Sequence, residues 1–186
     1  MGIITLIKTL TASDSASLDF VDGTSDVTLD STYDEYMFVF TDIGPATDNV
    51  RFQFQVNATD DAGGGYDTST ITTATWDGHA SEGEDAGAIE YQTGHDQAQG
   101  TAFQRIIGGV GSDADQSCAG VMHLFNPSST TYVKHFYAHT IHSQANDHVG
   151  NYFISGYIND TTAIDEIQFK MSSGNFDGVI QLYGVA

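Results

Sequence analysis

The chain has 186 residues, enough for one well-cored domain and short for two. It carries 25 acidic against 5 basic side chains, a formal net charge of -20, which repels a phosphate backbone and argues against nucleic-acid binding. An acidic excess of this size favours a strongly solvated exterior, bound cations, a basic partner surface or a saline setting. The many Tyr, Phe and Thr residues favour strands over helices.

The single cysteine, Cys118, excludes an intramolecular disulfide and a cysteine-based zinc cluster. Its small apolar neighbours predict a core residue rather than a nucleophile. Residues 1–17 lack the basic region and long apolar run of a secretion signal, and no run reaches the roughly 18 apolar residues of a membrane span. We therefore expect a chain that is made soluble, is not processed and has no membrane partner.

The first half of the chain predicts several strands in order. Residues 3–10 are apolar and threonine-rich, which predicts a first strand or a docking arm within residues 1–12. Residues 18–21 predict a second strand, and the aromatic alternation of residues 35–43 predicts a third that is buried on one face. The next strand has the cleanest alternation: Val50, Phe52, Phe54 and Val56 are expected inside, and Arg51, Gln53, Gln55 and Asn57 outside.

Residues 58–100 change in character and become rich in Gly, Asp, Thr and Ser. We expect long decorated loops and short edge strands here, with strand-like fragments at residues 69–76 and 88–92. Regular strands are predicted to resume after this region, at residues 101–107, 118–125, 131–142 and 152–158.

The last segment, Ala163 to Ala186, predicts a hairpin: two alternating apolar strands joined by SSGNFDG, whose Gly-Asn and Asp-Gly steps suit a turn that reaches positive φ. Many short strands with polar turns, and no good helix pattern, indicate an all-β fold. We predict one domain over residues 1–186, an antiparallel β-sandwich with long Gly/Asp-rich loops.

The sequence indicates no enzyme. It contains no nucleophile elbow, zinc-protease motif, phosphate loop or dinucleotide fingerprint. Paired carboxylates such as Asp60-Asp61 lie in turn-like, exposed contexts, whereas acid catalysis needs one carboxylate whose pKa is raised by burial next to another. Asp113 and Asp115 resemble the start of an EF-hand calcium loop, but the later Gly and Glu of that loop are absent. A structural Ca²⁺ or Na⁺ site formed by other Asp-rich loops remains an open alternative. We predict no other cofactor.

Two kinds of ring side chain suggest binding surfaces. His135 and His139 are predicted on one strand face, too far apart at about 3.3 Å per residue to share a zinc ion, and a surface or subunit-contact role is expected. His142 is expected on the opposite face of that strand. Other aromatic residues lie in the loose middle region and would form either a sugar-stacking platform or ordinary loop packing; they are Tyr66, Trp76 and Tyr91.

Both ends of the chain carry a recognisable pattern. At the N-terminal side it consists of LIKTLTASDSASLDF, then DSTYDEYMFVFTDIGPATDNVRFQFQV and a Gly-rich GGGYD; at the C-terminal end it is IDEIQFKMSSGNFDGVIQLYGV. The residues that carry the pattern are Tyr33, Tyr36, Ile43, Pro45, Ala46, Gly174, Asn175, Gly178, Leu182, Tyr183 and Gly184. In these motifs the chain resembles a family of virion structural proteins of tailed bacteriophages. Residues of about 58–150 are not covered by this resemblance.

The resemblance implies a jelly-roll-like sandwich without catalytic residues, located in the virion. We expect a decoration (cement) protein, made in the bacterial host cytoplasm, that binds the major capsid protein on the outer surface of the capsid as a homo-oligomer. A trimer would match the local threefold positions of a capsid lattice. The expected contact strand consists of Ile3, Ile4, Thr5, Leu6 and Ile7. The alternative is a tail-fibre or tail-tip module that recognises host-surface glycans through Tyr66, Trp76 and Tyr91.

Overall fold

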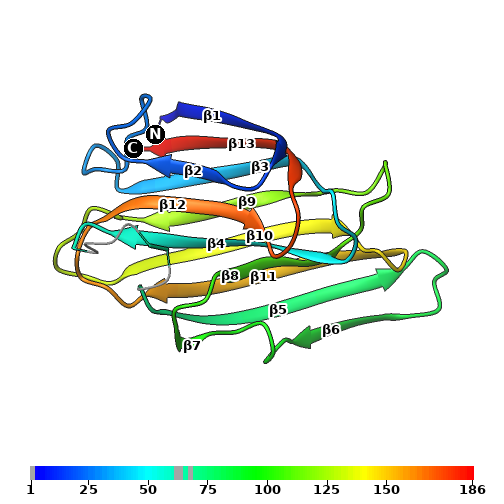
Figure 1. Ribbon diagram of the computed structural model, residues 1–186. Helices are drawn as coiled ribbons and strands as arrows, with labels where there is room; N and C mark the ends of the chain where they lie inside the picture. The colour runs from blue at the N-terminus through cyan, green and yellow to red at the C-terminus, as the bar shows by residue number, and fades with distance from the viewer. Residues whose placement is uncertain (1–2, 61–64, 67–68) are drawn as a thin grey trace.

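The computed structural model describes residues 3–60, 65–66 and 69–186, and these form two antiparallel sheets that face each other as a sandwich (Figure 1). The larger sheet has the order β1-β13-β3-β9-β10-β11-β5-β6, with β7 also paired to β5, and the smaller has the order β2-β12-β4-β8. The predicted all-β sandwich is confirmed. The strands are β1 (Ile4–Ser15), β2 (Leu18–Val21), β3 (Glu35–Pro45), β4 (Val50–Ala58), β5 (Ile71–Ser81), β6 (Gly87–Tyr91), β7 (Ala98–Gly100), β8 (Gln104–Val110), β9 (Cys118–Phe125), β10 (Lys134–Ser143), β11 (His148–Ile158), β12 (Ile164–Met171) and β13 (Phe176–Val185).

Eight of these strands follow a jelly-roll path. One half of the sandwich is β1-β13-β3-β9 and the other is β2-β12-β4-β8. Strands that follow each other along the chain, such as β1 and β2 or β3 and β4, lie in opposite sheets, so the chain wraps around the core instead of forming hairpins. The first strand and the last strand pair antiparallel, from Ile4 with Val185 onward, which brings the two chain ends together (Figure 1).

The remaining strands extend the larger sheet beyond the jelly roll. We call β10, β11, β5, β6 and β7 the wing; they form the lower part of the molecule in Figure 1. The edge strand of the small sheet, β8, packs against β10 and β11, while β5, β6 and β7 lie at the far end of the large sheet. Four strands of the wing, β5, β6, β7 and β10, come from the region that the family resemblance does not cover.

The core is held by phenylalanine rings from both sheets. Phe169 on β12 lies at its centre, completely buried, with five other aromatic rings at centroid distances between 5.2 and 6.3 Å. Two of those rings belong to the large sheet, which makes Phe169 a direct link between the two layers. The five rings are Phe20, Phe38, Phe40, Phe52 and Phe54.

The expected C-terminal hairpin is wrong. The strands β12 and β13 lie in different sheets, where β12 pairs with β2 and β4, and β13 pairs with β1 and β3. Both strands carry buried apolar faces, and these can meet only across the core, so the connection crosses between layers. Its glycines serve that crossing: Gly174 has a φ of 72° and lies against Thr47, and Gly178 has a φ of 135° at a register shift in β13.

The expected outward face of β4 is also partly wrong, since Gln55 and Asn57 are buried. The Nε2 atom of Gln55 donates to the backbone oxygen of Thr101 at 2.8 Å and lies within 3.3 Å of those of Ser69 and Ala102. The chain on either side of β5, β6 and β7 therefore covers this part of the small sheet. These hydrogen bonds offset the free-energy cost of burying the amide group, which would be large if the amide had no partner.

The middle of the chain is more regular than its composition suggests. The 11-residue strand β5 lies inside the large sheet, between β11 and β6, although residues 58–100 were expected to be loops and short edge strands. Its inward side chains Thr73, Thr75 and Asp77 are buried but polar, so the strand lacks the apolar alternation that would reveal it in the sequence. Other expectations are confirmed: Cys118 is buried and free, and β9 has the predicted bounds.

The position of Phe169 makes a prediction about stability. Replacing it by alanine removes a ring that touches both sheets, and we expect a loss of about 3–5 kcal/mol in the free energy of unfolding. The matched control is Phe153→Ala on β11, where the same side chain is 48% exposed. Urea unfolding should show a change of at most about 1 kcal/mol for the control. Equal losses in the two variants would contradict the assigned role of Phe169.

His142 on β10 points into the sandwich, as expected, and is only 3% exposed. Its ring packs on Tyr152 with a centroid distance of 5.5 Å, and a Cβ on its strand partner Gly150 would overlap it. Burial lowers the pKa of His142 from its usual value of 6.5 to about 4. The folded protein therefore keeps this ring neutral at pH values where the unfolded chain would protonate it.

That difference predicts a loss of stability in acid. Between about pH 6.5 and pH 4 the unfolded state binds the extra proton, so the free energy of unfolding falls as the pH falls, by at most about 3 kcal/mol from this group. The variant His142→Phe should lose less stability than wild type over that range in urea titrations at several pH values. The control His135→Phe, exposed on the same strand, should keep the wild-type slope. Parallel slopes for all three proteins would contradict the prediction.

Candidate interaction surface

A row of ring side chains crosses the outer face of the wing, the face turned away from the small sheet. Tyr91 on β6 pairs across strands with Trp76 on β5. Trp76 pairs in turn with Phe153 on β11, and Phe153 with His139 on β10. Tyr91, Trp76 and Phe153 are each about half exposed. We call these four residues the aromatic ladder.

The rings of the ladder contact one another. His139 stacks on Phe153 with a centroid distance of 4.3 Å and an interplanar angle of 13°. Trp76 and Tyr91 lie 5.0 Å apart at 43°. The Nε2 atom of His139 also lies 2.8 Å from the side-chain oxygen of Asn151, and a hydrogen bond there fixes the ring. Cross-strand packing of this kind holds the rings in place before anything binds.

A second stack lies next to the ladder on β9 and β10. His123 and Tyr137 are 4.5 Å apart at an angle of 14°, and Phe125 follows at 5.9 Å from Tyr137. His123 is hydrogen-bonded to the carboxylate of Glu35 on β3. Ser155 on β11 and Ala74 on β5 continue the row of His123 and Tyr137 across the sheet, and their small side chains leave a groove beside the ladder.

The outer face of the wing and of β9 carries no Asp, Glu, Lys or Arg at its strand positions. We call this set the aromatic face, and its residues are Ala119, Val121, His123, Phe125, His135, Tyr137, His139, Ile141, Ser143, Val149, Asn151, Phe153, Ser155, Tyr157, Thr72, Ala74, Trp76, Gly78, Ala80, Gly87, Ile89 and Tyr91. On a chain of net charge -20, an uncharged surface that spans five strands is a departure from the rest of the molecule. Interfaces show the same depletion of charge and enrichment in aromatic rings.

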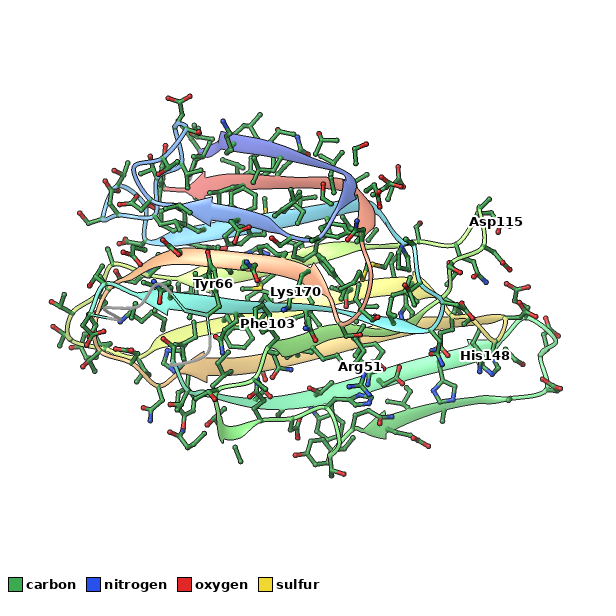
Figure 2. All side chains as sticks on the ribbon, viewed as in Figure 1. Arg51, Tyr66, Phe103, Asp115, His148 and Lys170 are labelled. Carbon is green, nitrogen blue, oxygen red and sulfur yellow. The ribbon has the colours of Figure 1, made fainter. Side chains whose placement is uncertain are left out.

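The structure places the predicted glycan residues on two sides of the sandwich. Trp76 and Tyr91 meet on the aromatic face, as described above. Tyr66 does not join them: it packs 6.5 Å from Phe103, which Lys170 of the small sheet also contacts (Figure 2). Burial raises the pKa of the Tyr66 hydroxyl, which is hydrogen-bonded to two carboxylates. Tyr66 therefore fits the loop-packing alternative.

The predicted contact strand is part of the domain and not a free arm. Ile4, Thr5, Leu6 and Ile7 belong to β1, the outermost strand of the large sheet, and Ile3 directly precedes it. Ile3, Ile4 and Leu6 are 71%, 58% and 51% exposed, while Ile7 packs partly against the core. Leu6 points outward in register with Tyr183, on the same side of the sheet as the aromatic face. Its role in binding stays a prediction.

The histidine prediction is confirmed in its geometry, since His135 and His139 both face outward on β10. Sequence reasoning missed two of their neighbours, His123 and Phe153. The outward positions of β11 at every second residue from Val149 could have revealed Phe153, because they alternate with buried ones. Nothing local in the sequence indicates that His123 stacks on Tyr137, which depends on the register of β9 with β10.

The loops provide no metal centre among the described residues. No three His, Cys, Asp or Glu side chains within residues 3–60, 65–66 and 69–186 come together as a metal site. Asp113 and Asp115 lie in the exposed loop between β8 and β9 and line one pocket with Asp42 of β3 and Asp177 of β13 (Asp115 is labelled in Figure 2). Within the same ranges the structure contains no helix long and apolar enough to cross a membrane.

Comparison of this chain with protein-family models, with curated proteins and with solved structures finds no match. Among the surfaces described above, the aromatic face has the composition that most resembles a protein interface.

The aromatic face predicts a measurable surface property. At high salt, where the acidic charges are screened, the protein should bind strongly to a hydrophobic-interaction column through this face. Phe153→Glu should elute markedly earlier, with a free energy of unfolding within about 1 kcal/mol of wild type, because the side chain is half exposed.

The matched control is Tyr132→Glu, which changes an exposed tyrosine in the loop before β10 and leaves the face intact. It should elute close to wild type. Equal shifts for the two variants would mean that column binding does not use the aromatic face.

Proposed function

We propose that this chain is a non-enzymatic structural protein of a tailed-bacteriophage particle, made in the cytoplasm of the bacterial host. In this proposal it decorates the outer surface of the capsid and contacts the major capsid protein through the aromatic face. The observation that carries the proposal is the uncharged, ring-rich outer side of the wing and β9 on a chain of net charge -20. The family resemblance of both chain ends and the jelly-roll path support the particle setting.

The charge distribution suits this arrangement. A partner that covers the aromatic face removes no carboxylate of the wing from water, so binding avoids the largest desolvation penalty. The acidic surface then stays in solvent, where repulsion between neighbouring copies limits uncontrolled association. Many copies with modest individual affinity would together stabilise a shell by avidity.

The edge strand β1 gives the proposal a second contact. It pairs with β13 on one side only, and its exposed Ile4 and Leu6 lie on the same side of the sheet as the aromatic face. An open edge accepts a further strand from a neighbour through backbone hydrogen bonds. In the proposal this edge joins copies into a homo-oligomer, and a trimer would match the threefold positions of the lattice.

The proposal predicts the copy number on purified particles and the environment of the sole tryptophan, Trp76. Quantitative mass spectrometry should give a ratio of this protein to the major capsid protein near one to one, or another large fraction set by the capsid lattice.

When the protein is added back to particles that lack it, Trp76 emission should shift to the blue and acrylamide should quench it less, because the aromatic face is covered. Phe153→Glu should bind at least tenfold more weakly and Tyr132→Glu should bind as wild type. A copy number of only a few per cent of that of the major capsid protein would contradict a role in decorating the capsid.

A second candidate is a tail-tip module that binds host-surface glycans. The exposed, contacting rings of Trp76 and Tyr91 favour it, because sugar rings pack on exposed aromatic faces. A low copy number, together with glycan-array binding that Trp76→Ala abolishes, would support this candidate over decoration.

A further inference from the structure

A polar pocket lies on the inner side of the wing, behind the aromatic ladder. It has a volume of about 520 Å³, within the range of small-molecule sites, and is formed by β5, β8, β11 and the loops around Asn49 and Asn146. Because successive side chains of β5 alternate between faces, Trp76 points to the aromatic face and Asp77 into this pocket. His148 marks one edge of the pocket (Figure 2).

The pocket holds a buried carboxylate with unused hydrogen-bonding capacity. Asp77 is 6% exposed, and its Oδ2 atom lies 3.7 Å from Nδ1 of His79. Its Oδ1 atom is buried and has no hydrogen-bond partner within the described residues. Burial raises the pKa of this carboxyl group, while the neighbouring His79 and Arg105 oppose the rise. A buried oxygen of this kind is costly unless something hydrogen-bonds to it.

A guanidinium group lies in the same pocket. Arg105 on β8 donates from Nη2 to the hydroxyl of Tyr152 at 3.1 Å and lies over that ring at 5.5 Å, while its buried Nε has no partner within the described residues. A Cβ on Gly108 would overlap the guanidinium, so the glycine is what lets Arg105 lie along its own strand. Burial lowers the pKa of Arg105, and the positive charge of Arg51 on β4 adds to that effect.

The presence of both a carboxylate and a guanidinium group in the pocket limits the kinds of ligand that can bind there. An anion would meet the carboxylate of Asp77, and a simple cation would meet the guanidinium of Arg105, so neither fits alone. A neutral ligand rich in hydroxyl groups fits both, because each hydroxyl donates to the carboxylate oxygen and accepts from the guanidinium or from His79. The ring of Tyr152 adds a flat apolar wall.

We propose that this pocket binds a neutral saccharide, with Asp77 and Arg105 as its main hydrogen-bonding partners. The site is separate from the aromatic face and does not depend on the proposed contact with the capsid. It gives the inner side of the wing a function while the outer side is covered.

The test is a titration of the whole chain, labelled with ¹⁵N, with glucose, galactose, mannose, N-acetylglucosamine and lactose, each at millimolar concentrations, followed by amide shifts. Glucuronate and glucosamine serve as the anionic and cationic comparisons. We expect saturable shifts for at least one neutral sugar at Gly108, Gly109 and Ala145, which line the pocket. Asp77→Asn and His79→Ala should each weaken that binding at least tenfold.

Tyr132→Glu is the control, since Tyr132 lies in the loop before β10, outside both the pocket and the aromatic face, and this variant should bind as wild type. The two pocket variants differ in burial, so a folding defect in one does not remove the test, and far-ultraviolet circular dichroism checks each fold. No shift at the pocket with any neutral sugar would overturn the proposal. So would shifts that survive both pocket variants, or binding confined to glucuronate or glucosamine.

Discussion

The sandwich depends on the contact of aromatic rings across the two sheets around Phe169. This cluster lies between the eight jelly-roll strands, and the small sheet reaches little beyond it. The large sheet is more than twice as wide, so the wing has no apolar layer over β5. The inner side chains of β5 at Thr73, Thr75 and Asp77 are polar, and on its outer side Trp76 is half exposed. The mismatch in sheet width thus creates both surfaces to which we assign functions.

The strand β5 shows how one element can serve two surfaces. Its outward residue Trp76 takes part in the aromatic ladder, and the next residue, Asp77, lines the polar pocket. Both side chains project from β5, whose backbone is hydrogen-bonded to β11 on one edge and to β6 on the other. The same strand pairing therefore holds Trp76 and Asp77 in fixed positions. A rigid support lowers the entropy lost on binding, which matters most for weak contacts that act in large numbers.

The sequence predicts the jelly-roll half better than the wing. Phe52 and Phe54 alternate with polar residues and identify β4 directly, and Tyr36, Phe38 and Phe40 do the same for β3. The wing strand β5 buries Thr75 and Asp77, so a pattern of apolar periodicity does not find it. Trp76 and Tyr91 were identified as candidates, but their partner Phe153 was not, because cross-strand register is a property of the folded sheet. The C-terminal glycines indicated a tight turn but not which sheet each strand joins.

The antiparallel pairing of β1 with β13 has a practical consequence for protein engineering. Residues near both chain ends, Ile4 and Val185, are strand partners on the edge of the large sheet opposite the wing. A cargo protein attached to either end would therefore emerge from the same place, away from the aromatic ladder and the polar pocket. Affinity tags and fluorescent reporters can thus be fused there with both surfaces left accessible, and two different cargoes on one copy would be held side by side.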